Sequence, residues 1–173
     1  MSIQDIIKSK VPDYAEIEVF FFEQCNLRCI HCFQDHESTV GMSKENILAK
    51  TDIIEDFFKR TTKTEVVLNI MGGELFQDNL LEEFLPVYSE FIDRIQLLSI
   101  QHNKKPKFNF VTNLLVTRHD LFKEWLIQHE LKLSVSYDLT GRFNTKQIEI
   151  FKDNIEEYRD QIGLICLVAT NPN

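Results

Sequence analysis

The strongest constraint on the fold is an alternation of short apolar runs with longer segments whose apolar residues recur every three or four positions. The short runs, rich in β-branched and aromatic residues, predict strands at 17–22, 66–71, 108–111, 131–137 and 163–170. The longer segments predict helices that begin after Ser43, cover 79–98 and 119–129, and begin again at Asn144. Such alternation builds right-handed βαβ units. The sequence therefore predicts an α/β fold with a parallel sheet, either doubly wound or a partial (βα) barrel.

Three local features add detail to this prediction. The run Val66 to Met71 is almost continuously apolar, which is typical of a strand buried on both faces of a parallel sheet. Pro86 lies within the helix predicted over 79–98 and is expected to interrupt or restart it. Cys166 falls in the middle of the last strand, where it is expected to be a small core residue.

Composition limits the class of protein. A chain of 173 residues with 43% hydrophobic residues is long and apolar enough for one domain with a sizeable core. Its formal net charge of −8 does not favour electrostatic binding to nucleic acid or to an anionic membrane. The apolar runs are too short to span a bilayer, and the first residues do not resemble a signal peptide. We therefore expect a cytoplasmic protein.

The cysteines carry the first chemical signal. Cys25, Cys29 and Cys32 fall within eight residues, whereas the fourth, Cys166, is far along the chain. In a reducing cytosol, such a cluster is typical of metal ligation or redox chemistry rather than of disulfide bonds. Soft thiolates bind zinc, copper(I) or an iron–sulfur cluster. A zinc site would need a fourth ligand, for which His36 is geometrically possible.

The other unusual residues follow predicted strands. Gly72-Gly73-Glu74 comes directly after the second strand, Asn113 after the third, and Ser134, Ser136 and Asp138 share one face of the fourth. In parallel α/β sheets, chemistry gathers at the carboxyl ends of the strands. These side chains and the cysteines are therefore expected to surround one site. For the two glycines, a simple left-handed turn is the alternative explanation.

Two motifs together resemble a known family. Cys25-Asn26-Leu27-Arg28-Cys29-Ile30-His31-Cys32 has the Cys-x3-Cys-x2-Cys spacing of the radical S-adenosylmethionine (radical SAM) enzymes. Gly72-Gly73-Glu74 is similar to that family's Gly-Gly-Glu motif, although Leu75 stands where members usually have Pro. The resemblance covers residues 14–173 and implies a partial parallel (βα) barrel of the radical SAM type. It also implies that residues 1–173 form a single core domain with an N-terminal extension over 1–14.

The resemblance implies a chemistry and a set of ligands. Cys25, Cys29 and Cys32 would hold a [4Fe–4S] cluster whose open iron chelates S-adenosylmethionine (AdoMet). The reduced cluster would cleave AdoMet to a 5′-deoxyadenosyl radical, which abstracts hydrogen from a substrate. Residues expected to contact this cofactor are Gly72, Gly73, Glu74, Asn113, Ser136, Asp138 and His31. The form Cys-Asn-Leu-Arg-Cys resembles peptide-modifying members, which suggests a peptide or protein substrate, and a flavodoxin-like protein is the expected electron donor.

Two alternatives and one structural question stay open. The chain could be a zinc-binding module that uses Cys25, Cys29, Cys32 and His36, or a non-catalytic remnant that binds the cluster without turnover. Because barrels of this family generally have six βα units, five strands predict a barrel that is truncated after the fifth. The edge of that strand would then be unpaired, unless a partner or a second copy of the chain covers it.

Overall fold

The computed structural model describes residues 12–29, 32–138 and 142–168. Five strands alternate with four helices in these ranges: β1 (Tyr14–Phe20), α2 (Lys44–Arg60), β2 (Glu65–Met71), α3 (Leu81–Gln101), β3 (Lys105–Thr112), α4 (His119–Gln128), β4 (Lys132–Asp138), α5 (Thr145–Glu157) and β5 (Ile162–Val168). No helix of the described residues is both long and apolar enough to cross a membrane.

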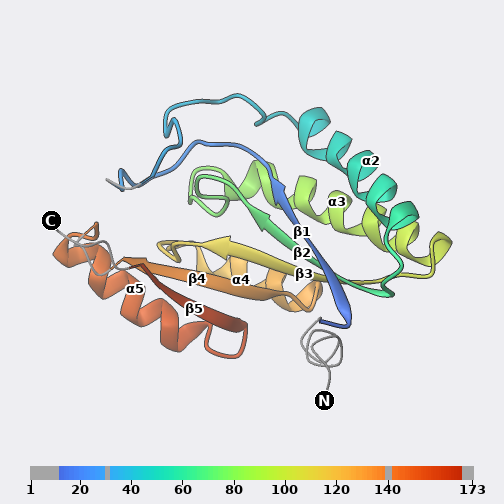
Figure 1. Cartoon of the computed structure of the whole chain (residues 1–173). Coiled ribbons are helices and arrows are strands. Elements are labelled where there is room, and N and C mark those ends of the chain that lie inside the picture. The colour runs from blue at the N-terminus through green and yellow to red at the C-terminus, as the bar shows by residue number, and fades with distance from the viewer. Residues whose placement is uncertain (1–11, 30–31, 139–141, 169–173) are drawn as a thin grey trace, which may run out of the picture.

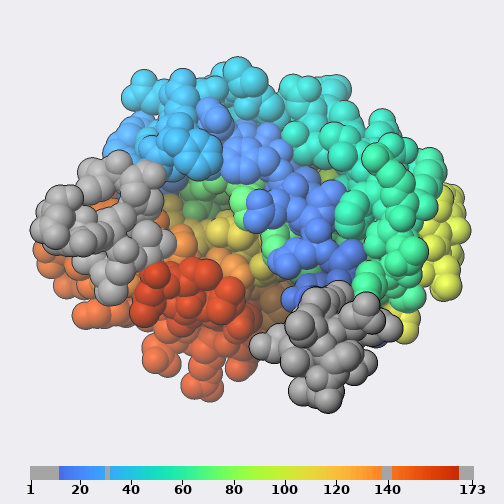
Figure 2. Space-filling model, in the orientation of Figure 1, coloured from blue at the N-terminus to red at the C-terminus, as the bar shows by residue number. Residues whose placement is uncertain are grey.

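The strands form one parallel sheet in the order β1-β2-β3-β4-β5. Because the order never reverses, right-handed crossovers place every helix on the same side of the sheet. Figure 1 shows the helices along the outer side of a curved sheet. The arrangement is thus an open partial barrel and not a doubly wound sheet. Its concave face is hollowed in the space-filling view of Figure 2, between β1 and β5.

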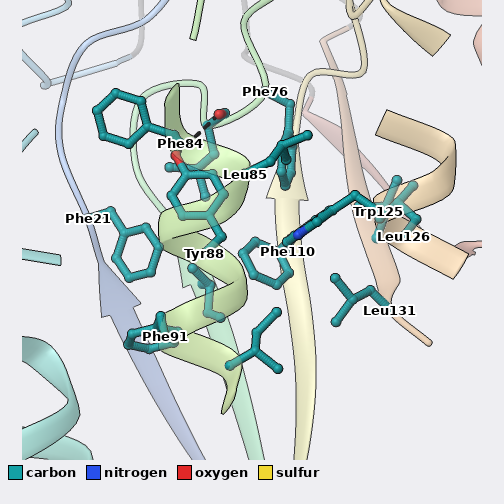
Figure 3. Close-up of a cluster of buried hydrophobic side chains, with 14 of the residues drawn as sticks. Phe21, Phe76, Phe84, Leu85, Tyr88, Phe91, Phe110, Trp125, Leu126 and Leu131 are labelled. Atoms are coloured by element: carbon teal, nitrogen blue, oxygen red, sulfur yellow. Dashed lines mark hydrogen bonds between the residues drawn. The ribbon is translucent and has the colours of Figure 1, made fainter. Parts of the chain in front are cut away.

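The core lies between the helices and the convex face of the sheet, and it is rich in aromatic rings (Figure 3). Phe76 packs on Phe122 with ring centroids 4.6 Å apart, and Phe110 meets Trp125 edge to face at 5.4 Å. Tyr88 is fully buried against this cluster, and its hydroxyl donates to the carbonyl of Leu75 at 3.3 Å. This hydrogen bond satisfies the tyrosine hydroxyl, which is the one polar group of the buried side chain.

The expectation for the second strand is wrong in one respect. Val66, Leu68 and Ile70 of β2 are completely buried against the helices, but the residues between them are only half-buried. Their side chains point to the concave face, where the open barrel provides no second layer of helices. Asn69 on this face donates to Glu16 of β1. The strand is therefore covered by helices on one face only.

Two further expectations are corrected by the structure. Pro86 does not interrupt α3, which continues from Leu81 to Gln101. Its neighbours Leu85, Val87 and Tyr88 are buried, and this burial outweighs the single backbone hydrogen bond that a proline removes. Cys166 is exposed rather than buried, because it pairs with Ser136 of β4 and so points to the concave face, which has no second layer of helices among the described residues.

Candidate functional site

A cavity of about 230 Å³ lies at the carboxyl ends of the strands. Residues from four separate parts of the chain line it: Cys25, Leu27, Cys29, Cys32, Phe33, Gln34, His36, Gly72, Gly73, Glu74, Val111, Thr112, Asn113, Ser136 and Arg142. The cysteine loop, the Gly-Gly-Glu motif and the ends of β3 and β4 thus meet at one place. A larger cavity of about 700 Å³ lies nearer the amino ends of the strands, but none of the three motif cysteines lines it.

The cysteine loop is tied back on itself by backbone hydrogen bonds. The N–H of Cys25 donates to the carbonyl of His36 at 3.1 Å, and the N–H of Cys32 donates to that of Cys29 at 3.0 Å. The N–H of Leu27 points at Sγ of Cys25 over 3.4 Å, and the Leu27 side chain anchors the loop in the core. All three thiols are partly buried. Burial raises the pKa of Cys25 to about 11, so this thiol is neutral when nothing is bound to it.

The three thiols line the same cavity, but they are not arranged as the ligands of one metal ion. Across the described ranges, no group of three or more His, Cys, Asp or Glu side chains converges as the ligands of one ion would. The donor chemistry nevertheless fits a thiolate-ligated, negatively charged group. Three thiols face one space, and among the described residues the buried Nε of Arg142 in the same wall has no hydrogen-bond partner.

The two glycines allow a close contact between backbones. The N–H of Gly73 donates to the carbonyl of Phe22 at 2.7 Å, and the N–H of Glu74 donates to that of Gln24 at 2.9 Å. A Cβ on Gly72 would lie 2.6 Å from the Phe22 carbonyl oxygen, and one on Gly73 would lie 2.0 Å from that of Gln24. Neither glycine has a positive φ, so the left-handed turn considered from sequence is wrong. The glycines join the end of β2 to the segment that leads into Cys25.

Glu74 is buried, with 2% of its surface exposed, and braces the ends of β2 and β3. Its Oε1 accepts from the N–H of Phe76 at 3.0 Å and from the hydroxyl of Thr112 at 2.7 Å. Its Oε2 accepts from the N–H of Asn113 at 2.6 Å. Burial raises the pKa of Glu74, although these hydrogen bonds and the charge of Arg142 act in the opposite direction. Because a carboxylate oxygen can accept two hydrogen bonds, Oε2 keeps one position that no donor among the described residues uses, and Glu74 lines the cavity.

Asn113 connects the same brace to the cysteine loop. Its Nδ2 donates to Oδ1 of Asn26 at 2.8 Å, and its Oδ1 accepts from the N–H of Leu115 at 3.1 Å. Asn113 therefore links the end of β3 to the residue that follows Cys25. This side chain lines the cavity, as the sequence predicted for the end of a parallel strand.

The remaining predicted residues lie as follows. Ser136 lines the cavity, whereas Ser134 lines the larger one and donates to Oδ1 of Asn109 at 3.0 Å. Asp138 is the last residue of β4, and its side chain is not described. His31 lies outside the described residues. His36, the possible fourth zinc ligand, lines the same cavity as the cysteines.

Sequence reasoning missed the position of two residues. An arginine directly after a glycine suggests a partner of a carboxylate or a surface residue, but Arg142 reaches into the cavity wall beside Cys29 and Ser136. Gln34 had no signal at all, yet its Nε2 donates to the carbonyl of Gly72 at 3.1 Å and holds the cysteine loop against the glycine motif. Both contacts join segments far apart in the sequence, which no local pattern reveals.

Comparison with known proteins gives support at the level of the fold. No protein-family model matches the chain, and no curated protein matches it. Among solved structures, the chain is similar to anSMEcpe, a radical SAM anaerobic sulfatase-maturating enzyme, with AdoMet bound. The TM-score is 0.55 for both the His-tagged and the native form, at 15% and 16% sequence identity respectively. The complex of that enzyme with AdoMet and the Cp18Cys peptide gives a TM-score of 0.53 at 17% identity.

These similarities cover 88% of this chain but only 42–44% of anSMEcpe. The chain thus spans less than half the length of the structures that it resembles. At this identity the likeness concerns the fold, and the open partial barrel is of the radical SAM type.

Proposed function

We propose that the chain is a radical SAM enzyme core that binds a [4Fe–4S] cluster and AdoMet in the 230 Å³ cavity. The observation that carries this proposal is that the three motif cysteines and Gly-Gly-Glu, 40 or more positions apart, line the same cavity at the carboxyl ends of the strands. The likeness to AdoMet-bound structures supports a fold suited to that chemistry.

Each side of the cavity has a distinct task in this proposal. Cys25, Cys29 and Cys32 would hold the cluster, which supplies the electron that cleaves AdoMet so that its adenosyl fragment takes a hydrogen atom from the substrate. The free position of Glu74 Oε2 suits the ammonium group of AdoMet. Gly72 and Gly73 line the cavity, and by allowing the end of β2 to approach the backbone of Phe22 and Gln24 they would hold this wall against the cysteine loop.

Asn113, Ser136, Asp138 and His31 are proposed as further AdoMet contacts. Asn113 and Ser136 line the cavity and offer an amide and a hydroxyl to the ribose or carboxylate oxygens. We further propose a peptide or protein substrate, a flavodoxin-like electron donor and a cytoplasmic location, because the cluster thiolates need a reducing compartment. The cysteine motif and the complex of anSMEcpe with the Cp18Cys peptide support the substrate class.

A second candidate is a structural zinc site formed by Cys25, Cys29, Cys32 and His36. It is favoured by one observation, namely that His36 lines the same cavity as the three thiols. Three cysteines and one histidine are a common set of ligands for structural zinc. In that case Gly72, Gly73 and Glu74 would serve only to hold the loops together.

Anaerobic reconstitution with iron and sulfide separates the two candidates. We expect the wild type to bind about four iron ions per chain. After reduction, its electron paramagnetic resonance spectrum should change shape on addition of AdoMet. Cys29→Ser should lose this cluster, whereas Cys166→Ser is the matched control, because Cys166 is exposed on β5 and does not line the cavity. Stoichiometric zinc without iron would refute the proposal, and a cluster that never yields 5′-deoxyadenosine would indicate the non-catalytic remnant.

A further inference from the structure

Arg142 is held in the cavity wall from three directions. Its Nη2 donates to both the carbonyl and the hydroxyl oxygen of Ser136, the latter at 3.1 Å. The guanidinium carbon lies 4.8 Å from the ring centre of Phe143, a cation–π geometry. Its Nη1 lies 3.6 Å from Sγ of Cys29, within hydrogen-bond range for sulfur. The guanidinium is therefore fixed beside one particular thiol.

The charge of Arg142 has no direct ion pair among the described residues. None of the salt bridges found there involves it, and within the same ranges its buried Nε has no hydrogen-bond partner. Glu74 is the buried acid whose pKa its charge lowers, but that carboxylate is engaged with donors from β3 and the Gly-Gly-Glu loop. A partly buried guanidinium without an anion at contact distance is unfavourable. The cavity wall is thus prepared for a negative group next to Cys29.

The three motif sulfurs are also unequal in their surroundings. Cys25 receives a backbone N–H from Leu27 at 3.4 Å, and Cys29 receives the side chain of Arg142. Within the part of the chain that the structure describes, Arg142 is the one side chain that donates to any of these sulfurs. Hydrogen bonds to sulfur and nearby charge are the means by which a protein adjusts the reduction potential of an iron–sulfur cluster.

We propose that Arg142 raises the reduction potential of a cluster held by Cys25, Cys29 and Cys32, by donating to the Cys29 thiolate and placing a fixed positive charge beside it. This inference rests on the proposed function. Reduction adds one electron and makes the cluster one charge more negative, so a neighbouring cation stabilises the reduced state more than the oxidised one. Arg142 acts through Cys29 and is a positioning residue rather than a catalytic one.

The test is the midpoint potential of the reconstituted cluster, measured without AdoMet by dithionite titration with electron paramagnetic resonance detection. For Arg142→Gln we expect at least a tenfold decrease in the equilibrium constant for one-electron reduction, which equals a potential lower by about 59 mV. Arg142→Lys keeps the positive charge but loses the planar guanidinium group with its several donors, so a smaller decrease in the potential is expected. Arg60→Gln removes the same charge from the exposed end of α2 and should leave the potential unchanged.

The experiment distinguishes a failure of the role of Arg142 from a failure of the proposed function. A wild type that binds no iron refutes the proposed function itself. An Arg142→Gln protein with full iron content and the wild-type potential overturns the role of Arg142 alone. If that variant also binds AdoMet more weakly, the guanidinium serves a ligand carboxylate instead. Where Arg142→Gln fails to hold a cluster, Arg142→Lys decides the question, and a wild-type potential in that variant overturns the inference.

Discussion

Removing the Glu74 carboxylate is expected to destabilise the protein strongly. Glu74→Ala leaves three buried donors without an acceptor: the N–H groups of Phe76 and Asn113 and the hydroxyl of Thr112. Each unsatisfied buried group costs about 1–3 kcal/mol, which gives roughly 3–9 kcal/mol in total. Part of this is offset, because the variant no longer buries a carboxylate whose pKa is raised by burial. We therefore expect the free energy of unfolding to fall by about 3–5 kcal/mol.

The isosteric variant Glu74→Gln should be milder. An amide oxygen in place of Oε1 can keep the bonds from Phe76 and Thr112, but an NH2 group in place of Oε2 would face the N–H of Asn113. One short charge-assisted hydrogen bond is then replaced by two opposed donors. We expect a loss of about 1–3 kcal/mol, less than for Glu74→Ala.

Urea unfolding followed by circular dichroism measures both variants. Thr112→Val removes one bond of the brace and also leaves the N–H of Leu114, which donates to the Thr112 hydroxyl at 3.0 Å, without that acceptor, so it should cost about 1–3 kcal/mol. Glu149→Ala, on the exposed side of α5, removes a carboxylate that has no such contacts and should change stability by less than about 0.5 kcal/mol. A Glu74→Ala protein that loses less than about 1 kcal/mol would refute the assignment of Glu74 as a brace.

Further predictions concern stability in the same assay. Because the pKa of folded Glu74 is raised, wild-type stability should fall as pH rises from about 4 toward that value, a slope that Glu74→Gln lacks. Gly73→Ala should prevent cooperative folding, since its Cβ would lie 2.0 Å from the Gln24 oxygen. Asn154→Ala leaves two buried carbonyls, now bonded at 2.8 Å, without a donor and should cost about 2–3 kcal/mol. Asn144→Ala should cost about 1 kcal/mol by removing the capping box of α5.

The order and type of the elements could be predicted because each has a distinct periodicity. The helix start predicted at Asn144 is confirmed, because Asn144 and Gln147 form the capping box that their spacing in the sequence indicates. The boundaries were harder to predict from pattern alone. The first strand was expected at 17–22 and spans Tyr14–Phe20, because Phe21 and Phe22 are buried but lie beyond the regular strand. Burial and strand pairing are separate properties. An apolar run in the sequence indicates which residues are buried, but not which of them pair with a neighbouring strand.

The exposure of Cys166 and the one-sided burial of β2 could not be read from composition. Both depend on whether a second layer covers the concave face, and this is a property of the closed or open state of the barrel. An apolar strand in a doubly wound sheet and one in an open barrel have similar sequences. The strand order, which only the structure supplies, distinguishes the two.

The site shows why residue identity is easier to predict than residue role. The sequence placed Gly-Gly-Glu at a strand end, but its contacts are with chain segments about 40 to 50 residues away, such as Gln24 and Asn113. Arg142 and Cys29 are 113 positions apart. The same groups that are proposed to bind AdoMet also hold the loops that carry the cysteines. A loss of AdoMet binding in Glu74→Gln could therefore come from the ligand contact or from a loosened site. It identifies a ligand contact only if the loss of binding is larger than the measured losses of stability and of cluster content can account for.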